Sequence, residues 1–212
     1  MLNIHIKKKQ NLVTNIYLTS ILMLLLITAA EVFANNPPSK SIPINKNLQS
    51  KYNLINTHHA PPLAKYTNNK ILVGKIHYKY WFWEIYDAYL YSNNGRFSWD
   101  NNFILKIRYL RDFSSESIIK ETIKQIRSQR NNNVTDSLLS KWEGKLMKVI
   151  PNIKEKDTLI GIYNINGFTL FYMGNGQYLG SIRGKLFAKC FFNIWLGDNN
   201  KDIELSRKLR GL

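Results

Sequence analysis

Aromatic and aliphatic side chains dominate residues 81–91 (WFWEIYDAYLY), which polar segments flank. Strand side chains alternate between two faces. One face would carry Trp81, Trp83, Ile85, Asp87, Tyr89 and Tyr91, and the other Phe82, Glu84, Tyr86, Ala88 and Leu90. Because both faces are mostly apolar, the pattern predicts a strand at the centre of a sheet. Glu84 and Asp87 are then expected to be paired within the fold or to belong to a site, since a buried carboxylate needs a partner.

Further strands are predicted on both sides of this segment. Residues 70–79 form a first strand, and 93–95 (Asn-Asn-Gly) form a turn that tolerates positive backbone angles. Residues 103–110 alternate, with Leu105, Ile107 and Tyr109 on one face and Lys106 and Arg108 on the other. This strand is half solvated, or its basic face covers something acidic.

Two amphipathic helices follow. Ser114 is placed to cap the first, which carries a stripe of isoleucines opposite a basic face. Thr135 is placed to cap the second, whose apolar residues recur every four positions until Pro151 ends it.

The C-terminal part is predicted as three strands and two helices. Residues 158–165, 168–173 and 177–182 form an antiparallel meander with turns at Asn166-Gly167 and residues 174–176. Residues 184–195 form a mostly buried helix that Gly197 closes, and 202–210 form a short basic one. The order of elements predicts an α+β domain with helices packed on an antiparallel sheet.

The N-terminus is typical of a signal peptide. Lys7, Lys8 and Lys9 precede an apolar run at 16–27, and Val32-Phe33-Ala34 suits signal peptidase. We predict export to the periplasm with cleavage after Ala34; the alternative is an uncleaved anchor. Residues 35–68, which hold five of the six prolines, are predicted to be a flexible lead-in, and 69–212 a single domain.

Charge and cysteine content narrow the function classes. The formal net charge is +16, and +14 without residues 1–34, which favours an anionic partner such as a membrane surface or an acidic ligand. Nucleic acid is not expected, because no binding motif is recognisable. The single Cys190 lies among apolar residues and is predicted to be a core thiol. We expect neither cofactor nor metal, since His58 and His59 in a loop lack zinc-ligand spacing.

The order of several motifs resembles the chalcone isomerase-like family, in its exported bacterial branch. They are Val73-Gly74, the block at 86–91, the strand–helix junction from Lys106, the hairpin with Asp157, the glycine turns at 176 and 180, Phe187 and the closing Trp195-Leu196-Gly197. The resemblance covers residues 70 to the C-terminus. It implies an open-faced β-sandwich, an antiparallel sheet covered by helices, with a ligand cleft between the two layers.

The enzymes of that family use an arginine on the strand before the central one, a threonine on the central strand, a tyrosine and an asparagine from the helices, and a hydroxyl before the closing pair. Here the preceding strand has Lys75, His77 and Lys79, the threonine position falls near Glu84, and Ile194 precedes Trp195. The break between the two helices, where the resemblance places the tyrosine, has Gln129 to Asn133 instead. A carboxylate or an isoleucine cannot donate to a developing oxyanion. The resemblance therefore implies a non-catalytic relative.

We expect a small apolar or fatty-acid-like ligand between sheet and helices. Its binding residues are predicted to be Lys75, His77, Glu84, Tyr89, Arg108 and Tyr109. Two alternatives stay open. The first is an intramolecular lyase or isomerase in which Lys75 or His77 replaces the arginine and burial raises the pKa of Glu84 so that it acts as a base. The second is a module that docks on an anionic envelope through its basic surface, chiefly Lys120, Lys124, Arg127, Arg183, Lys185, Lys189, Arg207, Lys208 and Arg210.

Overall fold

The computed structural model describes residues 61–131, 133–198 and 202–212. The expected signal peptide, its cleavage site after Ala34, most of the lead-in, and His58 and His59 lie outside the described residues. Within the described part of the chain, no helix combines the length and apolarity needed to cross a membrane.

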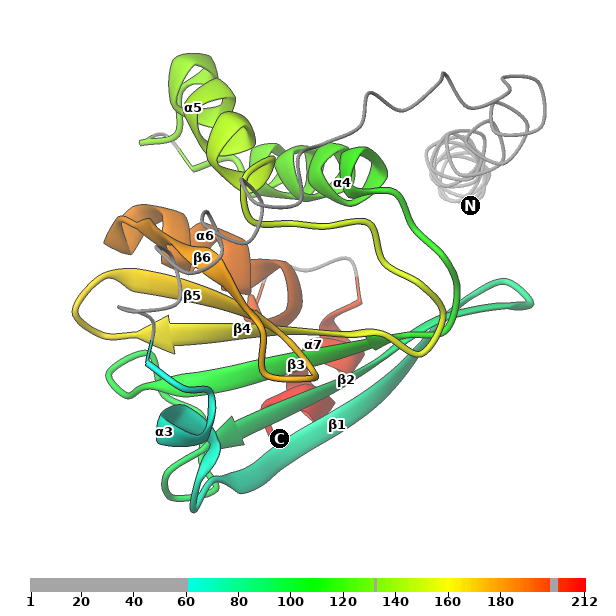
Figure 1. The fold of residues 1–212 in the computed structure, drawn as a ribbon, viewed down its shortest axis with the longest axis vertical. Helices are drawn as coiled ribbons and strands as arrows, with labels where there is room; N and C mark the ends of the chain where they lie inside the picture. Colours follow the sequence, from blue (N-terminus) through cyan, green and yellow to red (C-terminus); the bar gives the residue numbers. More distant parts are fainter. Residues whose placement is uncertain (1–60, 132, 199–201) are drawn as a thin grey trace, which may run out of the picture. The chain divides into compact units, whose positions relative to one another are not determined.

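A six-stranded antiparallel sheet forms the framework, and its strands follow one another in sequence order (Figure 1). The strands are β1 (Ile71–Tyr80), β2 (Trp83–Ser92), β3 (Phe103–Tyr109), β4 (Thr158–Asn164), β5 (Phe168–Met173) and β6 (Tyr178–Arg183). The predicted C-terminal meander is confirmed, with Gly167 and Gly176 at positive φ in its two turns. Glycine favours these turns because it has no Cβ to clash there.

Helices cover one face of the sheet, which we call the inner face. α6 (Lys185–Leu196) lies over β5 and β6, α7 (Ile203–Leu209) lies over β1, and α4 (Ser115–Ser128) packs against α5 (Asp136–Leu146) and α6. Ser114 and Thr135 cap α4 and α5 as predicted, accepting hydrogen bonds from the backbone N–H groups of Ser117 and Leu138. The predicted α+β architecture is thus confirmed.

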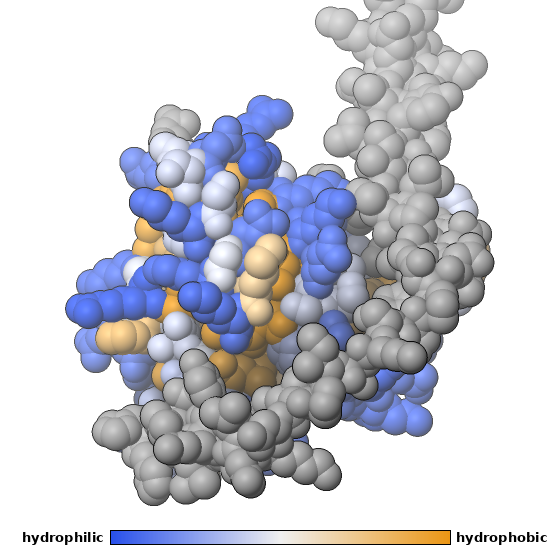
Figure 2. Space-filling view, turned by 45° about the horizontal axis from the view of Figure 1, so that its top comes forward, coloured by the Kyte–Doolittle hydropathy of each residue, from blue (hydrophilic) through white to orange (hydrophobic). Residues whose placement is uncertain are grey.

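The inner face and the helices bury one large apolar cluster. The alternate residues Ala88, Leu90, Leu105 and Ile107 point into it, and Cys190 of α6 is also buried there, as predicted. Burial raises the pKa of the Cys190 thiol, which keeps the thiol protonated. Hydrophilic side chains cover most of the visible surface in Figure 2, and apolar ones show between them.

The opposite, outer face carries a second, smaller cluster. It consists of Ile104, Ile160, Ile162, Leu170 and Tyr172. The short helix α3 (Ala64–Thr67) lies against it, with Leu63 and Tyr66 packed on the apolar side chains. Residues 61–68 were expected to be part of a flexible lead-in. They instead pack on the sheet, because burial of these two side chains offsets the entropy of ordering a short segment.

The predicted strand at 81–91 needs two corrections. It begins only at Trp83, and it lies second in the sheet beside the edge strand β1 rather than at the centre. Trp81 and Phe82 form the β1–β2 turn, in which Trp81 has a φ of +57°. No Gly, Asn, Asp or Pro marks this turn, and a non-glycine residue rarely adopts such a φ, so the run of rings was read as one continuous strand.

Candidate functional site

The outer face brings together most of the residues predicted to bind a ligand. Lys75 pairs in register with Tyr89, and His77 pairs with Asp87, which pairs in turn with Arg108. All point away from the helices, because strand side chains alternate and the neighbouring Ile76, Ala88 and Ile107 point inward.

Tyr109 is the exception in the predicted set. It belongs to the inner cluster, whereas Glu84 contacts the outer-face residues Lys79 and His77. The six residues therefore do not share one cleft between sheet and helices. Their charges were expected to converge there, but because side chains alternate along a strand, the cationic ones lie on the outer face, on the side of the sheet opposite α4–α7.

Four charged or titratable side chains form a chain of contacts across β1 and β2. His77 Nδ1 lies 2.6 Å from Asp87 Oδ1, and its Nε2 lies 3.6 Å from Glu84 Oε1. Lys79 Nζ lies 2.8 Å from the same Glu84 oxygen. The Lys79 ammonium, by its hydrogen bond and then its charge, lowers the pKa of the Glu84 carboxyl below its usual value.

The proposed role of Glu84 as a base with a raised pKa is therefore wrong. Its side chain is 54% exposed, so desolvation is too weak to oppose Lys79. A carboxylate with a lowered pKa is a poor proton acceptor near neutral pH.

Tyrosines supply the polar groups at the β1–β3 end of the inner face. The Tyr86 hydroxyl accepts a hydrogen bond from Trp195 Nε1 over 3.2 Å, and its ring stacks on Tyr78 at 5.0 Å. Burial raises the pKa of Tyr86 and Tyr109 well above the usual range. Burial, followed by the charge of Asp202, raises the pKa of Tyr78 to about 12. These hydroxyls stay neutral at physiological pH and can serve only as neutral hydrogen-bonding groups.

Aromatic rings of α6 fill the layer between sheet and helices. Phe192 lies 5.1 Å from the ring of Phe103 and 5.8 Å from that of Tyr163, while Phe191 lies 5.4 Å from Phe171. A Cβ at Gly161 would come within 3.1 Å of the Phe192 ring, so this glycine makes room for it. A ligand between the layers would have to displace these rings.

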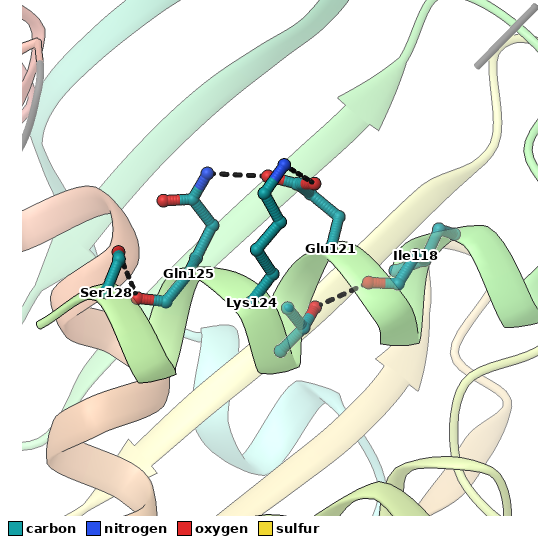
Figure 3. Close-up of polar contacts among 6 residues, drawn as sticks. Ile118, Glu121, Lys124, Gln125 and Ser128 are labelled. Atoms are coloured by element: carbon teal, nitrogen blue, oxygen red, sulfur yellow. Dashed lines mark hydrogen bonds and ion pairs between the residues drawn. The ribbon is translucent and has the colours of Figure 1, made fainter. Parts of the chain in front are cut away.

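Polar side chains on one side of α4 form hydrogen bonds and an ion pair with one another and with the helix backbone. Glu121 accepts a hydrogen bond from Gln125 Nε2 over 2.6 Å and lies 3.5 Å from Lys124 Nζ, as Figure 3 shows. Ser128 donates to the Gln125 carbonyl. These groups bind one another rather than converging on a bound molecule.

Gln129, which directly follows α4, connects α4 to α6 through hydrogen bonds. Gln129 Nε2 donates to the Cys190 carbonyl over 2.8 Å, and Asn193 Nδ2 donates to Gln129 Oε1 over 3.4 Å. The resemblance places the tyrosine of the family's enzymes at the break after α4. Gln129 thus has a structural role here, holding α4 to α6.

A pocket of about 320 Å³ opens where α3 meets the sheet. Its apolar lining comes from Tyr66, Phe103, Ile104 and Ile162, and its polar lining from Lys65, Lys70, Asn102 and Asn164. It lies at the end of the sheet where β1 and β3 begin and β4 ends. Apolar walls with a few convergent polar groups are typical of small-molecule sites.

A second pocket, of about 260 Å³, lies between α4 and α5. Arg127 and Arg130 line it, together with Asp136, which forms an ion pair with Arg127. That pairing leaves less positive charge for an acidic ligand than the α3 pocket offers.

Lys65 and Lys70, which line the α3 pocket, are not among the residues that the sequence predicted to bind a ligand. The signal that could have found them is the apolar pair Leu63 and Tyr66 between two prolines and two asparagines. The two members of the pair are three positions apart in the sequence, which is a spacing typical of one face of a helix. A single helical turn is too short for that pattern to outweigh the polar composition around it.

The chain is similar to known proteins in both sequence and fold. The family model described as chalcone isomerase-like matches residues 77–211. The chain belongs to the chalcone isomerase-like family. Among curated proteins, no sequence matches it significantly.

A solved structure supports the fold assignment. The crystal structure of a fatty-acid binding protein from Arabidopsis thaliana is similar over 68% of this chain and 88% of that chain, with a TM-score of 0.53 and 10% sequence identity. The sheet and helices of this chain are thus arranged like those of the plant protein. At 10% sequence identity, this likeness concerns the fold alone.

Proposed function

We propose that this chalcone isomerase-like protein is a non-catalytic binding protein for a small apolar acid, such as a fatty acid, and that the α3 pocket is its site. The family assignment and the fatty-acid binding protein with a similar fold support the class of function. The observation that carries the proposal is the pocket itself, which two lysines line together with apolar side chains.

The polar rim of the pocket is rich in hydrogen-bond donors. The side-chain oxygen of Asn102 accepts from Ile165 N over 2.9 Å, and that of Asn164 accepts from Asn166 N over 2.8 Å. Each amide therefore has its NH₂ group left to donate. With the ammonium groups of Lys65 and Lys70, these donors favour a carboxylate over a neutral head group.

Lys70 is already oriented by the protein. It lines the pocket, and its Nζ donates a hydrogen bond to Asn93 Oδ1 in the β2–β3 connection. An ammonium group has three donors, so this bond leaves two for a ligand. Lys65 lies on α3 and is exposed.

A ligand between the sheet and the helices is the other location to consider. There the rings of α6 occupy the space, and the nearby polar groups are neutral hydroxyls such as those of Tyr86 and Tyr109. The α3 pocket needs no ring to move and provides two cations, so it is the favoured site.

The side chains that would replace the family's catalytic groups support a non-catalytic function. Lys75 and His77 lie on the outer face, Glu84 is held by Lys79, and Ile194 precedes Trp195. None of these can stabilise an oxyanion that forms among the rings of the inner layer.

Binding of fatty acids to the full chain tests the proposal. Titration with saturated fatty acids of increasing length should give saturable binding of one molecule, seen also as a single adduct by native mass spectrometry. Lys65→Gln and Lys70→Gln should each weaken it about tenfold, since a charge-assisted hydrogen bond contributes about 1.5–3 kcal/mol.

Two matched controls complete this experiment. Lys141→Gln, an exposed lysine of α5, should leave the affinity unchanged, and methyl esters should bind weakly to every variant. No uptake of fatty acids would refute the binding function, whereas binding that ignores both pocket lysines would refute the site.

We also propose that the protein works after export, with residues 1–34 removed and an anionic membrane surface within reach of its basic side chains. The charge pattern of residues 7–9 and the apolar run after it support export. N-terminal sequencing of the protein recovered from its host should begin at Asn35. An intact Met1 would contradict cleavage.

A further inference from the structure

The turn between β1 and β2 exposes large aromatic side chains to solvent. Trp81 and Phe82 are each 71% exposed, and Trp83 is 38% exposed. Figure 1 shows this hairpin extending past the neighbouring loops. Water-exposed rings in such a row are unfavourable, and exposed apolar patches mark interaction sites.

The turn holds its rings in a fixed arrangement. Phe82 and Trp83 are 5.0 Å apart between ring centroids, Trp81 stacks on Tyr80 at 6.4 Å, and the Arg111 guanidinium lies 4.0 Å from the centre of the Trp83 ring. Trp81 adopts a φ of +57°, which a glycine or asparagine would adopt at less cost. The chain thus keeps large rings where an ordinary hairpin would place small residues.

The size of this tip argues against a folded protein as its partner. An aromatic side chain buries about 150–250 Å². Three partly exposed rings therefore offer less than the roughly 800 Å² per partner of a stable protein interface. A narrow, projecting set of rings is instead suited to insertion among lipids.

The chemistry of the tip matches the interfacial region of a bilayer. Tryptophan is enriched at membrane–water interfaces, where its ring is buried and its N–H stays hydrated. Arg111 lies against Trp83, where its guanidinium can reach lipid phosphates. The formal net charge, +16 for the full chain and +14 without residues 1–34, favours an anionic surface.

We propose that the tip formed by Trp81, Phe82 and Trp83 inserts into the head-group region of an anionic lipid bilayer. The rest of the sheet then stands above the membrane, attached by rings that enter only its outer few ångströms. This attachment is independent of whether the α3 pocket binds a fatty acid.

An environment-sensitive fluorophore placed at the tip tests the insertion in the full chain. Phe82→Cys introduces the reactive thiol, because the native Cys190 is buried. Met147→Cys provides the matched control, since Met147 is also a highly exposed apolar residue and lies at the end of α5. Vesicles of phosphatidylcholine alone, or mixed with phosphatidylglycerol, are then added, with and without brominated acyl chains.

The proposal predicts a blue shift and quenching by brominated lipid for the probe at 82, stronger with phosphatidylglycerol, and neither for the probe at 147. Adding Trp81→Ser and Trp83→Ser to the labelled chain should reduce the bound signal about tenfold. An unshifted probe at 82 on vesicle-bound protein would overturn the proposal. So would a blue shift that rises with protein concentration before any lipid is added, which would identify a second copy of the chain as the partner.

Discussion

The two faces of the sheet are built from the same strands and differ in almost every property. The inner face presents aliphatic and aromatic side chains to the helices and is sealed by rings such as Phe191 and Phe192. The outer face presents Lys75, His77 and Arg108 to solvent over one part and packs α3 over the other. The abundant rings therefore belong to a filled core, and the α3 pocket lies on the face that only a short helix covers.

Truncation of a central ring should show the largest difference between the faces. Phe192→Ala removes a fully buried ring that contacts Phe103 and Tyr163, and it should lower the free energy of unfolding by about 3–5 kcal/mol. Tyr89→Ala on the outer face is the control and should cost less than about 1 kcal/mol. Urea unfolding measures both; equal losses would mean that the inner layer is not the packed one.

Gly74→Ala tests how closely the inner face meets α7. A methyl group at this position would collide with the carbonyl oxygens of Lys208 and Leu209, which are backbone atoms that cannot rotate away. We expect a loss of about 1–3 kcal/mol in the free energy of unfolding. Gly144→Ala, where nothing lies within 4 Å, is the matched control and should not destabilise the protein. A tolerated Gly74→Ala would show that α7 is free to shift.

Removal of one hydroxyl on the outer face should have a smaller effect. Tyr172 donates a hydrogen bond to the Pro61 carbonyl over 2.7 Å and so holds the segment before α3. Tyr172→Phe should cost about 1 kcal/mol of unfolding free energy. It should also speed proteolysis near residue 61. Unchanged cleavage there would mean that other contacts hold α3.

Alkaline pH should weaken the same contact. Burial raises the pKa of Tyr172 to about 12, whereas an unfolded tyrosine has a pKa of about 10. Below pH 10 both states are protonated and the stabilisation is complete. Between pH 10 and 12 the unfolded chain loses the proton first, so stability falls as pH rises. Unfolding midpoints across this range should fall more steeply for the parent than for Tyr172→Phe; parallel curves would contradict the raised pKa.

Glu84→Gln should have the smallest effect. Its carboxylate is largely exposed and paired with Lys79, so we expect the urea midpoint and fatty-acid affinity of the parent to be kept. Lys79→Gln, which removes the other half of the ion pair, is the matched control. A large loss of fatty-acid binding in Glu84→Gln alone would place the ligand on the charged part of the outer face.

Sequence patterns predicted the local elements well. The boundaries of β5 matched, the N-caps Ser114 and Thr135 were identified, and the buried Cys190 was expected. These features depend on periodicity and capping within a few residues, which a single sequence records directly.

Three features could not be predicted, for different physical reasons. Alternation along β1 shows that Lys75 and His77 share one face of the strand. It does not show which face the helices cover, so the outward direction of these side chains could not be predicted. The turn at Trp81 breaks the usual rule for turn residues, because a tryptophan there adopts a positive φ. The α3 pocket combines residues about 100 positions apart, from Lys65 to Asn164, and no local pattern links them.

The most direct measurement is photocrosslinking of a diazirine-bearing fatty acid to the full chain, followed by mass spectrometric mapping of the labelled residues. We predict labels on Tyr66, Ile104 and Ile162, and their loss in Lys70→Gln. Labels on Phe191, Phe192 or Trp195 would contradict the outer-face site and place the ligand between the sheet and the helices.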